Sequence, residues 1–296
     1  MRRVAKWIGI VLGGLIALVL IAGVAMYVGS EGRFNKQYEV ATNPMTFHNN
    51  DEIIAEGARL AVIRGCTDCH GADLGGKIVI DESALGTIYA TNLTSGETGI
   101  GKEYSDDDLV HAIRYGVRKD GTGLLVMPSQ EYYVLSDEDV NALIAFIRYV
   151  PPVDREPPKE SLTILARALF MAGQLPPLAA EVIDHKAPRP EAPEVVAEAE
   201  FGAYLATSCT GCHGLDFSGG PIPGASPDTP LSSNLTPAGN LRDWDEAGFI
   251  QTFRTGVTPD GKELDPSIMP WPIGTAMTDV ELQALWAFLE NLPSIE

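Results

Sequence analysis

The sequence predicts a mainly α fold in which two tandem copies of one domain follow a single transmembrane helix. Three observations lead to this expectation. Residues 7–28 form an uncharged apolar run, a set of motifs from the first half recurs in order in the second half, and the regular apolar patterns have helical spacing. At 296 residues, the chain has room for two domains of ordinary size.

The first predicted element is an N-terminal membrane anchor, residues 1–30. Arg2, Arg3 and Lys6 precede an apolar run that is long enough to cross a hydrocarbon core of about 30 Å as a helix. Basic residues before such a run predict a cytoplasmic N-terminus. We therefore expect a single-pass protein of a bacterial cytoplasmic membrane, with its domains on the periplasmic side. The alternative is a cleaved signal peptide, although the apolar core of such peptides is usually only about 7–15 residues long.

The two predicted domains are visible as an internal repeat. A Cys-x-x-Cys-His motif begins at Cys66 and again at Cys209, and shorter motifs recur around it in the same order. We therefore expect one domain at residues 45–152 and a second at residues 195–296. The shorter motifs are Asn-Leu-Thr at Asn92 and Asn234, Arg-x-Gly at Arg114 and Arg254, and Met-Pro at Met127 and Met269.

Each copy is predicted to hold three short helices joined by long glycine-rich loops. The first helix carries apolar residues at helical spacing just before the cysteines, the second begins at an N-cap with an acidic first turn and ends at glycine, and the third opens like a capping box. No convincing strand alternation is visible in either copy. In the first copy these helices are expected at Asp51–Ile63, at residues 105–115 and from Ser136, and in the second the first and third are expected at residues 198–206 and from Thr278.

The loops at residues 71–102 and 214–243 are too long for a compact domain unless something inside the domain organises them. Three short helices with such loops bury little apolar surface of their own. We therefore expect each domain to contain a large hydrophobic insert.

The repeated motif identifies this insert, because Cys-x-x-Cys-His is the attachment sequence of a c-type haem. Two thiols at this spacing reach the two vinyl groups of one porphyrin, and the histidine then presents its imidazole to the iron. A zinc site would need ligands from two separate domains, and a disulfide would leave both histidines unexplained. We expect two covalently bound haem c groups, held by Cys66, Cys69 and His70 and by Cys209, Cys212 and His213.

Met127 and Met269 are the predicted sixth ligands of the two irons. A methionine thioether at this position raises the reduction potential, which suits an electron carrier. Both residues stand before proline at equivalent places in the repeat. Met277 is a competitor, but its counterpart is Leu135. The ordinary alternative for a methionine in a helical protein is core packing.

The histidines outside the motifs are weaker candidates for ligands. His111 lies on the predicted second helix, but its counterpart is Gln251, so we expect a solvated surface residue. His48 precedes the first domain and His185 lies in the linker, and neither receives a predicted role.

The run of residues 92–152 resembles the haem domains of class I c-type cytochromes. More narrowly, it resembles the cytochrome subunits of membrane-bound alcohol and gluconate dehydrogenases and their diheme relatives. The likeness covers residues 51–152 and 201–293. Those subunits usually carry three haem domains and a C-terminal membrane attachment, whereas this sequence has two haem motifs and an N-terminal apolar run.

The resemblance also implies details of each domain. In that fold the first and last helices cross closely, which suits Gly57 meeting Phe146 and Gly202 meeting Phe288. Four repeated polar residues are predicted to bond the haem propionates, because buried carboxylates need donors. The alternative for these four is a role in loop and helix structure alone. They are Asn92, Asn234, Arg114 and Arg254.

The linker at residues 153–194 is proline-rich and charged, with an apolar stretch at residues 161–174. This stretch is too short to span a bilayer. We expect it to pack across the two domains, with the membrane surface as the alternative.

These features predict a membrane-anchored diheme cytochrome that relays single electrons between respiratory or photosynthetic redox proteins, and no catalytic residue. Its partners would be a membrane dehydrogenase, a quinol-oxidising complex, a terminal oxidase or a small soluble carrier. The net charge of −19 argues against nucleic acid, although an acidic face could steer a basic protein partner. A diheme peroxidase-type enzyme is the alternative, but it needs an open sixth position. A structural or assembly subunit is a third possibility.

Overall fold

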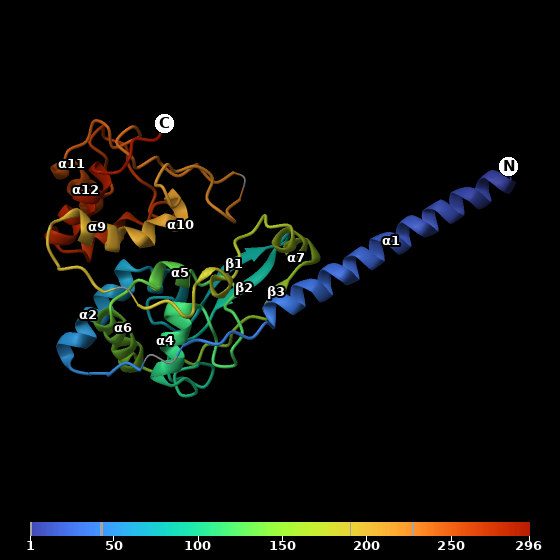
Figure 1. The fold of residues 1–296 in the computed structure, drawn as a ribbon, viewed down its shortest axis with the longest axis horizontal. Coiled ribbons are helices and arrows are strands. Elements are labelled where there is room, and N and C mark those ends of the chain that lie inside the picture. Colours follow the sequence, from blue (N-terminus) through green and yellow to red (C-terminus); the bar gives the residue numbers. More distant parts are fainter. Residues whose placement is uncertain (1, 42–43, 190, 227) are drawn as a thin grey trace.

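The computed structural model describes residues 2–41, 44–189, 191–226 and 228–296. One long helix projects from two helical units, and the second unit lies against the first (Figure 1). The mainly α fold expected from the sequence is therefore confirmed. Residue 1 of the expected anchor and residue 190 of the expected linker lie outside the described residues.

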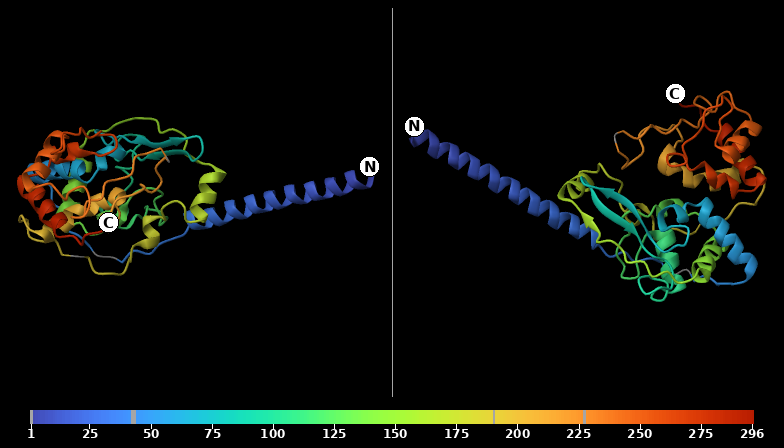
Figure 2. Two further views of the ribbon diagram at one scale, coloured as in Figure 1. Left: turned by 90° about the horizontal axis from the view of Figure 1, so that it is seen from above. Right: turned by 180° about the vertical axis from the view of Figure 1, so that it is seen from behind.

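The projecting helix is α1 (Arg2–Phe34), most of which extends away from the rest of the chain in both views of Figure 2. Its side chains are almost all exposed, and its most apolar window has a mean hydropathy of 2.8. By length and composition, α1 can cross a membrane. The single apolar helix expected at the N-terminus is therefore present.

The two units contain equivalent helices in the same order, except that the second has an additional 3-10 turn, η1, and a 3-10 helix, η2, in the place of α5. In the first unit these are α2 (Asp51–Ile63), α3 (Cys66–His70), α4 (Asp106–Tyr115), α5 (Ser129–Tyr132) and α6 (Asp137–Tyr149). In the second they are α9 (Ala199–Ala206), η1 (Thr207–Cys209), α10 (Thr210–His213), α11 (Glu246–Thr255), η2 (Trp271–Thr275) and α12 (Asp279–Glu290).

The helix ends follow the predicted caps. Ser105 and Asp108 form a capping box at α4, and Thr278 forms one with Glu281 at α12. At α6, Ser136 accepts a hydrogen bond from the Asp139 backbone N–H, but the carboxylate of Asp139 does not return to the cap. The box expected there therefore forms only in part.

The first and last helices of each unit cross at the predicted glycines. A Cβ atom at Gly57 would lie 1.9 Å from the Ala142 carbonyl oxygen, and one at Gly202 would lie 1.9 Å from the Ala284 carbonyl oxygen. Real atoms cannot approach so closely, so only glycine allows α2 to lie on α6 and α9 to lie on α12. The contacts with Phe146 and Phe288 are also present, at 2.9 and 2.7 Å from the same Cβ positions. The predicted close crossing is confirmed in both units.

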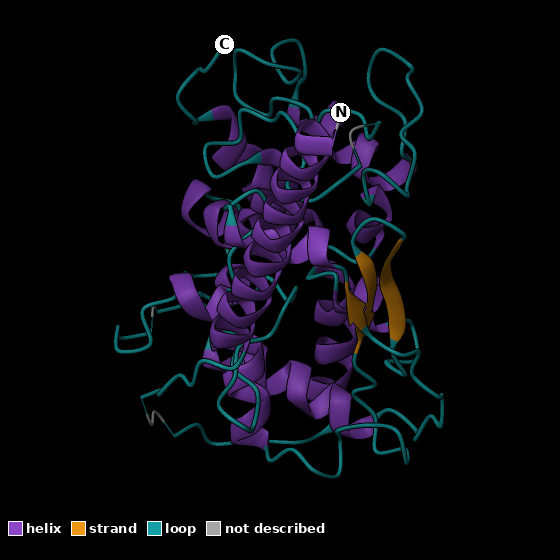
Figure 3. Cartoon of the chain, turned by 90° about the vertical axis from the view of Figure 1, so that its right-hand side faces the viewer, coloured by secondary structure: helices purple, strands orange, loops and turns teal. Residues whose placement is uncertain are grey.

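The expectation that the chain contains no strands is wrong for the first unit. Strands β1 (Lys77–Glu82) and β2 (Gly86–Ala90) form an antiparallel hairpin inside the loop at residues 71–102. β3 (Ser161–Leu162) from the linker adds to β2 and completes a small sheet at one side of the molecule (Figure 3). β1 could not be predicted from the sequence, because most of its side chains are exposed and its apolar and polar residues do not alternate.

The expectation that the apolar linker stretch packs across the two domains is also wrong. It forms α7 (Ile164–Met171), which packs on the end of α1. The reason is that α1 ends in groups that α7 complements: the Arg33 guanidinium lies 4.0 Å from the Phe170 ring centre, and Arg167 pairs with Glu31 at 2.8 Å. The linker helix α8 (Ala179–Val182) adds a second tie, because Glu181 pairs with Arg33 at 2.6 Å.

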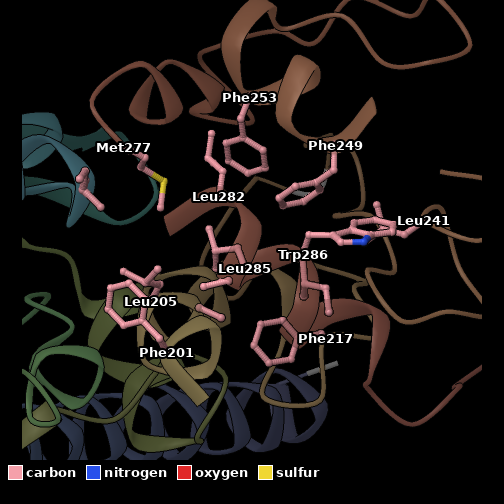
Figure 4. Close-up of a cluster of buried hydrophobic side chains, with 14 residues drawn as sticks. Phe201, Leu205, Phe217, Leu241, Phe249, Phe253, Met277, Leu282, Leu285 and Trp286 are labelled. Atoms are coloured by element: carbon pink, nitrogen blue, oxygen red, sulfur yellow. The ribbon is translucent and has the colours of Figure 1, made fainter. Parts of the chain in front are cut away.

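Each unit has its own hydrophobic core on the buried faces of its helices. The apolar stripe along the last helix is buried in both units. The core of the second unit collects aromatic rings from α9, α11 and α12 (Figure 4). The stripe residues are Val140, Leu143, Ile144 and Ile147 on α6 and Leu282, Leu285, Trp286 and Leu289 on α12.

Candidate haem-binding sites

One cavity in the first unit is lined by both the predicted attachment residues and the predicted sixth ligand. Cys66, Cys69 and His70 line it, as do Met127 and Pro128. The rest of its lining is largely apolar. It includes Leu74, Ile88, Leu93, Ile113, Leu124, Leu143 and Ile147.

The attachment residues lie on a very short helix bounded by glycines. α3 begins after Gly65 and ends at Gly71, where φ is +84°. In the second unit Gly214 follows His213 with a φ of +79°. This left-handed backbone favours glycine strongly, because a Cβ would clash with the chain. The glycine after each histidine therefore lets the chain turn away as soon as the imidazole has been placed.

Both imidazoles are oriented by the same backbone contact. Nδ1 of His70 lies 2.7 Å from the Thr91 carbonyl oxygen, and Nδ1 of His213 lies 2.8 Å from the Ser233 carbonyl oxygen. An Nδ1–H that donates to a carbonyl leaves Nε2 without a proton and able to bind iron. Burial lowers the pKa of both histidines, although the backbone bond opposes the shift. Both rings are therefore held neutral, as a metal ligand requires.

The cysteines have the properties of unmodified attachment thiols. All four are free, so the structure does not support the disulfide alternative. Burial raises the pKa of Cys66 and of Cys209 to about 12, so neither is a thiolate at neutral pH. Among the residues that the structure describes, no three His, Cys, Asp or Glu side chains gather as a zinc site would need.

The loop after each attachment helix contains a strained residue that the sequence did not reveal. Leu74 has a φ of +52° and Phe217, its counterpart, has a φ of +60°. Both side chains are buried, and Leu74 lines the cavity. Such backbone is uncommon for residues other than glycine and persists only where the surroundings enforce it. Here the carbonyl oxygens of Leu74 and Phe217 accept backbone hydrogen bonds from Leu93 and Leu235, which close the loop over the site.

The two Met-Pro segments lie at equivalent places. Met127 precedes α5 and packs against the first core, and Met269 precedes η2 and packs against the second core. Met277 is different, because it is buried inside the second core (Figure 4), as Leu135 is in the first. The structure therefore places Met277 as core packing.

Comparison with known families matches each unit separately. Residues 52–147 match the family described as cytochrome c oxidase, cbb3-type, subunit III, and residues 199–293 match the family described as cytochrome c. Both units are cytochrome c domains. Such domains imply covalently bound haem c, and the largely apolar cavity with its thiols and neutral imidazole fits that group.

Relatives with curated names are cytochrome subunits of dehydrogenases. The chain is 41% identical over 111 residues to the gluconate 2-dehydrogenase cytochrome c subunit of Pantoea cypripedii, covering 35% of this chain and 25% of that protein. It is 39% identical over 129 residues to the fructose dehydrogenase cytochrome subunit of Gluconobacter japonicus, covering 41% and 26%. It is 27% identical over 275 residues to the cytochrome c subunit of the quinone alcohol dehydrogenase of Gluconacetobacter polyoxogenes, covering 82% and 56%.

The chain therefore spans between about a quarter and about half of the length of these relatives. Their names fit an electron-transfer subunit and not an enzyme in its own right. The narrower likeness to alcohol and gluconate dehydrogenase subunits that the sequence suggested is confirmed.

Asn92 and Asn234 hold the same loop in the two cytochrome c domains. The side-chain oxygen of each accepts a backbone N–H two residues later, from Thr94 and Thr236, at 2.9 Å in both cases. The side-chain nitrogens donate to carbonyl oxygens beyond the last helix, at 2.6 Å for Asn92 and 2.7 Å for Asn234. These bonds serve loop structure, and contact with a propionate stays a prediction.

Arg114 and Arg254 tie the second helix of each domain to the start of the last helix. Arg114 is fully buried and pairs with Asp137 at 2.7 Å, and Arg254 pairs with Asp279 at 2.6 Å. Neither lines the cavity of the first domain. Their predicted propionate contacts therefore also remain predictions, beside a structural role that the geometry accounts for.

The polar groups on the cavity wall of the first domain are different ones. Arg118 and Glu160 line it, and Glu160 accepts a hydrogen bond from the Tyr89 backbone N–H at 3.2 Å. Arg118 corresponds to Thr258 in the second copy, so the repeat does not mark it as a site residue. The repeated Asp-Gly turn at Asp120-Gly121, close to Arg118, is the one sequence feature that could have drawn attention to it.

The remaining histidines lie away from the cavity wall. His111 is half-buried on α4 with its ring 6.2 Å from that of Tyr115, so it is less exposed than expected. His185 lies between Tyr38 and Tyr115, and its Nε2 lies 2.8 Å from the Ala180 carbonyl oxygen. The His48 backbone N–H donates to Asn141. These contacts anchor the segments that flank the first domain.

Proposed function

We propose that this chain is a membrane-anchored electron carrier with two c-type haems, each held by histidine and methionine. The observation that carries the proposal is the cavity of the first domain, where Cys66, Cys69, His70 and Met127 line one largely apolar space. The same residue types recur at Cys209, Cys212, His213 and Met269 on equivalent elements.

A haem c supplies one-electron exchange, and the protein supplies its position and environment. The two thiols fix the group covalently. The contact between His70 Nδ1 and Thr91 fixes the imidazole and leaves Nε2 able to bind iron. Met127 lines the same cavity and would supply the sixth ligand, and the largely apolar lining would keep water from the bound group. In the second domain, Ser233 holds His213 in the same way.

We further propose that α1 remains attached as the membrane anchor. At 1.5 Å per residue its 33 residues extend for about 50 Å, more than the hydrocarbon core requires. The last turns therefore extend beyond the lipid, where Arg33 and Glu31 pair with linker residues. Arg2, Arg3 and Lys6 at the opposite end place that end in the cytoplasm. The cytochrome c domains then lie on the periplasmic side of a bacterial membrane.

The proposed boundaries are those predicted from the sequence, with an anchor at residues 1–30, domains at 45–152 and 195–296, and a linker at 153–194. The linker contacts the first domain through β3 and α8, and its helix α7 packs on the end of α1. The first domain is thus the one tied to the anchor.

The proposed donor is a membrane dehydrogenase, because the relatives named above are cytochrome subunits of such enzymes. A quinol-oxidising complex, a terminal oxidase or a small soluble carrier would complete the chain of transfer. The net charge of −19 favours a basic docking surface on the soluble partner.

Methionine ligation is tested by replacing Met127 and Met269 with alanine, one at a time, in a bacterial host that matures c-type cytochromes. We expect the wild-type chain to carry two haem masses and the long-wavelength absorption band of methionine-bound ferric haem, and each variant to lose half of that band. Met277→Leu is the matched control, because it restores the residue type of the first copy and should leave the band unchanged.

The same preparations distinguish the alternative enzyme. A diheme peroxidase has a haem with an open sixth position and turns over peroxide. Sustained peroxide turnover by the wild-type chain, with high-spin signals from one haem, would overturn the electron-carrier proposal.

A further inference from the structure

The two cytochrome c domains meet through equivalent surfaces. The contact is formed by α2, α5 and the start of α6 in the first domain and by α9, η1, η2 and the start of α12 in the second. Ile63 of the first domain belongs to the hydrophobic core of the second, and Tyr204 of the second packs against the core of the first. The domains therefore share apolar as well as polar contacts.

One polar contact runs from the first domain to the second. The Arg59 guanidinium on α2 binds both carboxylate oxygens of Glu281 on α12, at 2.7 and 2.9 Å. Glu281 is buried, which alone would raise its pKa, but Arg59 and the cap bonds lower the pKa overall. Glu281 therefore stays charged, and the bidentate pair is a strong one.

A second contact runs in the opposite direction. The Tyr204 hydroxyl on α9 donates to the carboxylate of Asp139 on α6 and accepts the Ser136 backbone N–H at 3.0 Å. Tyr204 thus occupies the place where Asp139 would complete its own capping box. The incomplete box at α6 is a consequence of the contact between the domains.

The two contacts use equivalent positions of the two domains. Arg59 stands two residues after Gly57, and Tyr204 stands two residues after Gly202, at the matching helix crossings. Asp139 and Glu281 are each the third residue after the cap of the last helix. Each domain therefore offers the same two positions to the other, as in an isologous dimer interface.

Arg64 lies at the centre of this surface and joins the two attachment segments. Its side chain is buried, and Nη1 lies 3.3 Å from the carbonyl oxygens of Tyr204 and Leu205 and 3.3 Å from the Ser208 hydroxyl. Arg64 stands two residues before Cys66, and its acceptors lie in the turn that leads to Cys209. A cation is also favourable there because α9 ends at those carbonyl groups.

Gly211 brings the second motif itself to this surface. It lies between Cys209 and Cys212, and a Cβ atom there would be 2.7 Å from Oε1 of Glu131 on α5. The corresponding residue of the first motif is Asp68, which is exposed. A glycine therefore stands in the second motif, where the first domain lies against the chain, and a larger residue stands in the exposed first motif.

We propose that the two cytochrome c domains form one rigid electron-transfer unit, in which this pseudo-twofold surface brings the two attachment motifs together and carries the electron between them. The inference rests on the proposed function, because it requires one haem in each domain. No bond is made or broken in the step: one domain is oxidised and the other is reduced by a single electron. Arg64 is a positioning residue, which acts by holding the two motifs in place.

The test compares Gly211→Asp with Asp68→Gly in the full chain in lipid nanodiscs at pH 8. Each variant gives one motif the residue of the other, so both motifs keep a sequence that the chain itself uses. Gly211→Asp sets a carboxylate against Glu131 and should speed hydrogen exchange at α9 and η1 about tenfold or more. It should also slow electron exchange between the domains, after photoreduction of one, by about tenfold or more. Asp68→Gly should change neither.

Arg64→Met gives an independent test, because it keeps the buried volume and removes the hydrogen bonds. It should have the same two effects with haem content unchanged. Wild-type hydrogen exchange and wild-type electron exchange in both Gly211→Asp and Arg64→Met would overturn the inference. Fewer than two haem masses in the wild-type chain would instead overturn the proposed function, and the electron route with it.

Discussion

The two cytochrome c domains share the residues that we propose to bind haem and differ in the parts that surround them. Both have the glycine crossing of first and last helices, the short attachment helix, the histidine bonded to a carbonyl group and the Met-Pro segment. The first domain also has the β1–β2 hairpin, with Tyr89 and Glu160 on the cavity wall. In the described part of the second domain the equivalent loop has only an isolated bridge between Gly220 and Ser232.

The surroundings also differ in polar character. Arg118 of the first domain corresponds to Thr258 of the second, and Glu131 corresponds to Ile273. The linker helix α8 packs on the first domain, and α7 packs on the end of α1. Equal residues are thus the ones proposed to hold each haem, whereas unequal residues set its environment and its neighbours. Because exposure and nearby charge tune a haem potential, the two sites are expected to differ in potential.

The largest expected effect tests the shared part. Gly57→Ala and Gly202→Ala each place a methyl group 1.9 Å from a carbonyl oxygen, so each should destabilise its own domain by about 3 kcal/mol. Equal losses, measured by thermal unfolding, would show that the crossing is equally necessary in both copies. Gly32→Ala is the control, because nothing lies within 4 Å of its Cβ position in α1. An unchanged melting temperature in either crossing variant would contradict the equivalence of the two copies.

The shared part was predictable from the sequence because its signals are local or repeated. The attachment motif, the Met-Pro segment and the helix caps each lie within a few residues, and the repeat marks them twice. Gly57 and Gly202 could be paired with the last helices because the first and last helices cross closely in class I cytochromes, which the sequence resembles.

The unequal parts were not predictable for identifiable physical reasons. Strand β1 is half-exposed and pairs only with β2 and not with a buried sheet, so its apolar residues do not alternate. Arg118 has no counterpart of the same charge in the second copy, so the repeat gives no sign that it lines the cavity. Tyr204 contacts Arg64 and Asp139, which are 140 and 65 residues away in the sequence. No local sequence pattern predicts contacts over such separations.

A second prediction concerns Glu131, which the second domain replaces with isoleucine. Burial raises the pKa of Glu131 to about 7 from a usual value of 4.5. Between these values the folded state binds more protons than the unfolded state, so its stability falls as the pH rises through this window. Glu131→Gln should therefore be more stable than wild type by about 1–2 kcal/mol at pH 8, after discounting for solvent screening of this half-buried group.

The same variant should match wild type at pH 4, where the carboxyl is protonated in both states. Chemical unfolding at the two pH values measures the difference. A gain of the same size at pH 4 would mean that the charge of Glu131 is not the cause.

The smallest expected effect concerns the potentials. Arg118 is a permanent cation on the cavity wall of the first domain, and it favours the reduced haem, which carries one positive charge fewer. Arg118→Met should lower the potential of one haem by about 30–60 mV, which is up to a tenfold change in its redox equilibrium. Thr258→Arg, the opposite change in the second domain, should raise the potential of the other haem. Spectroelectrochemical titration of both variants measures this, and a shift of both potentials together in either variant would show that the two environments are not independent.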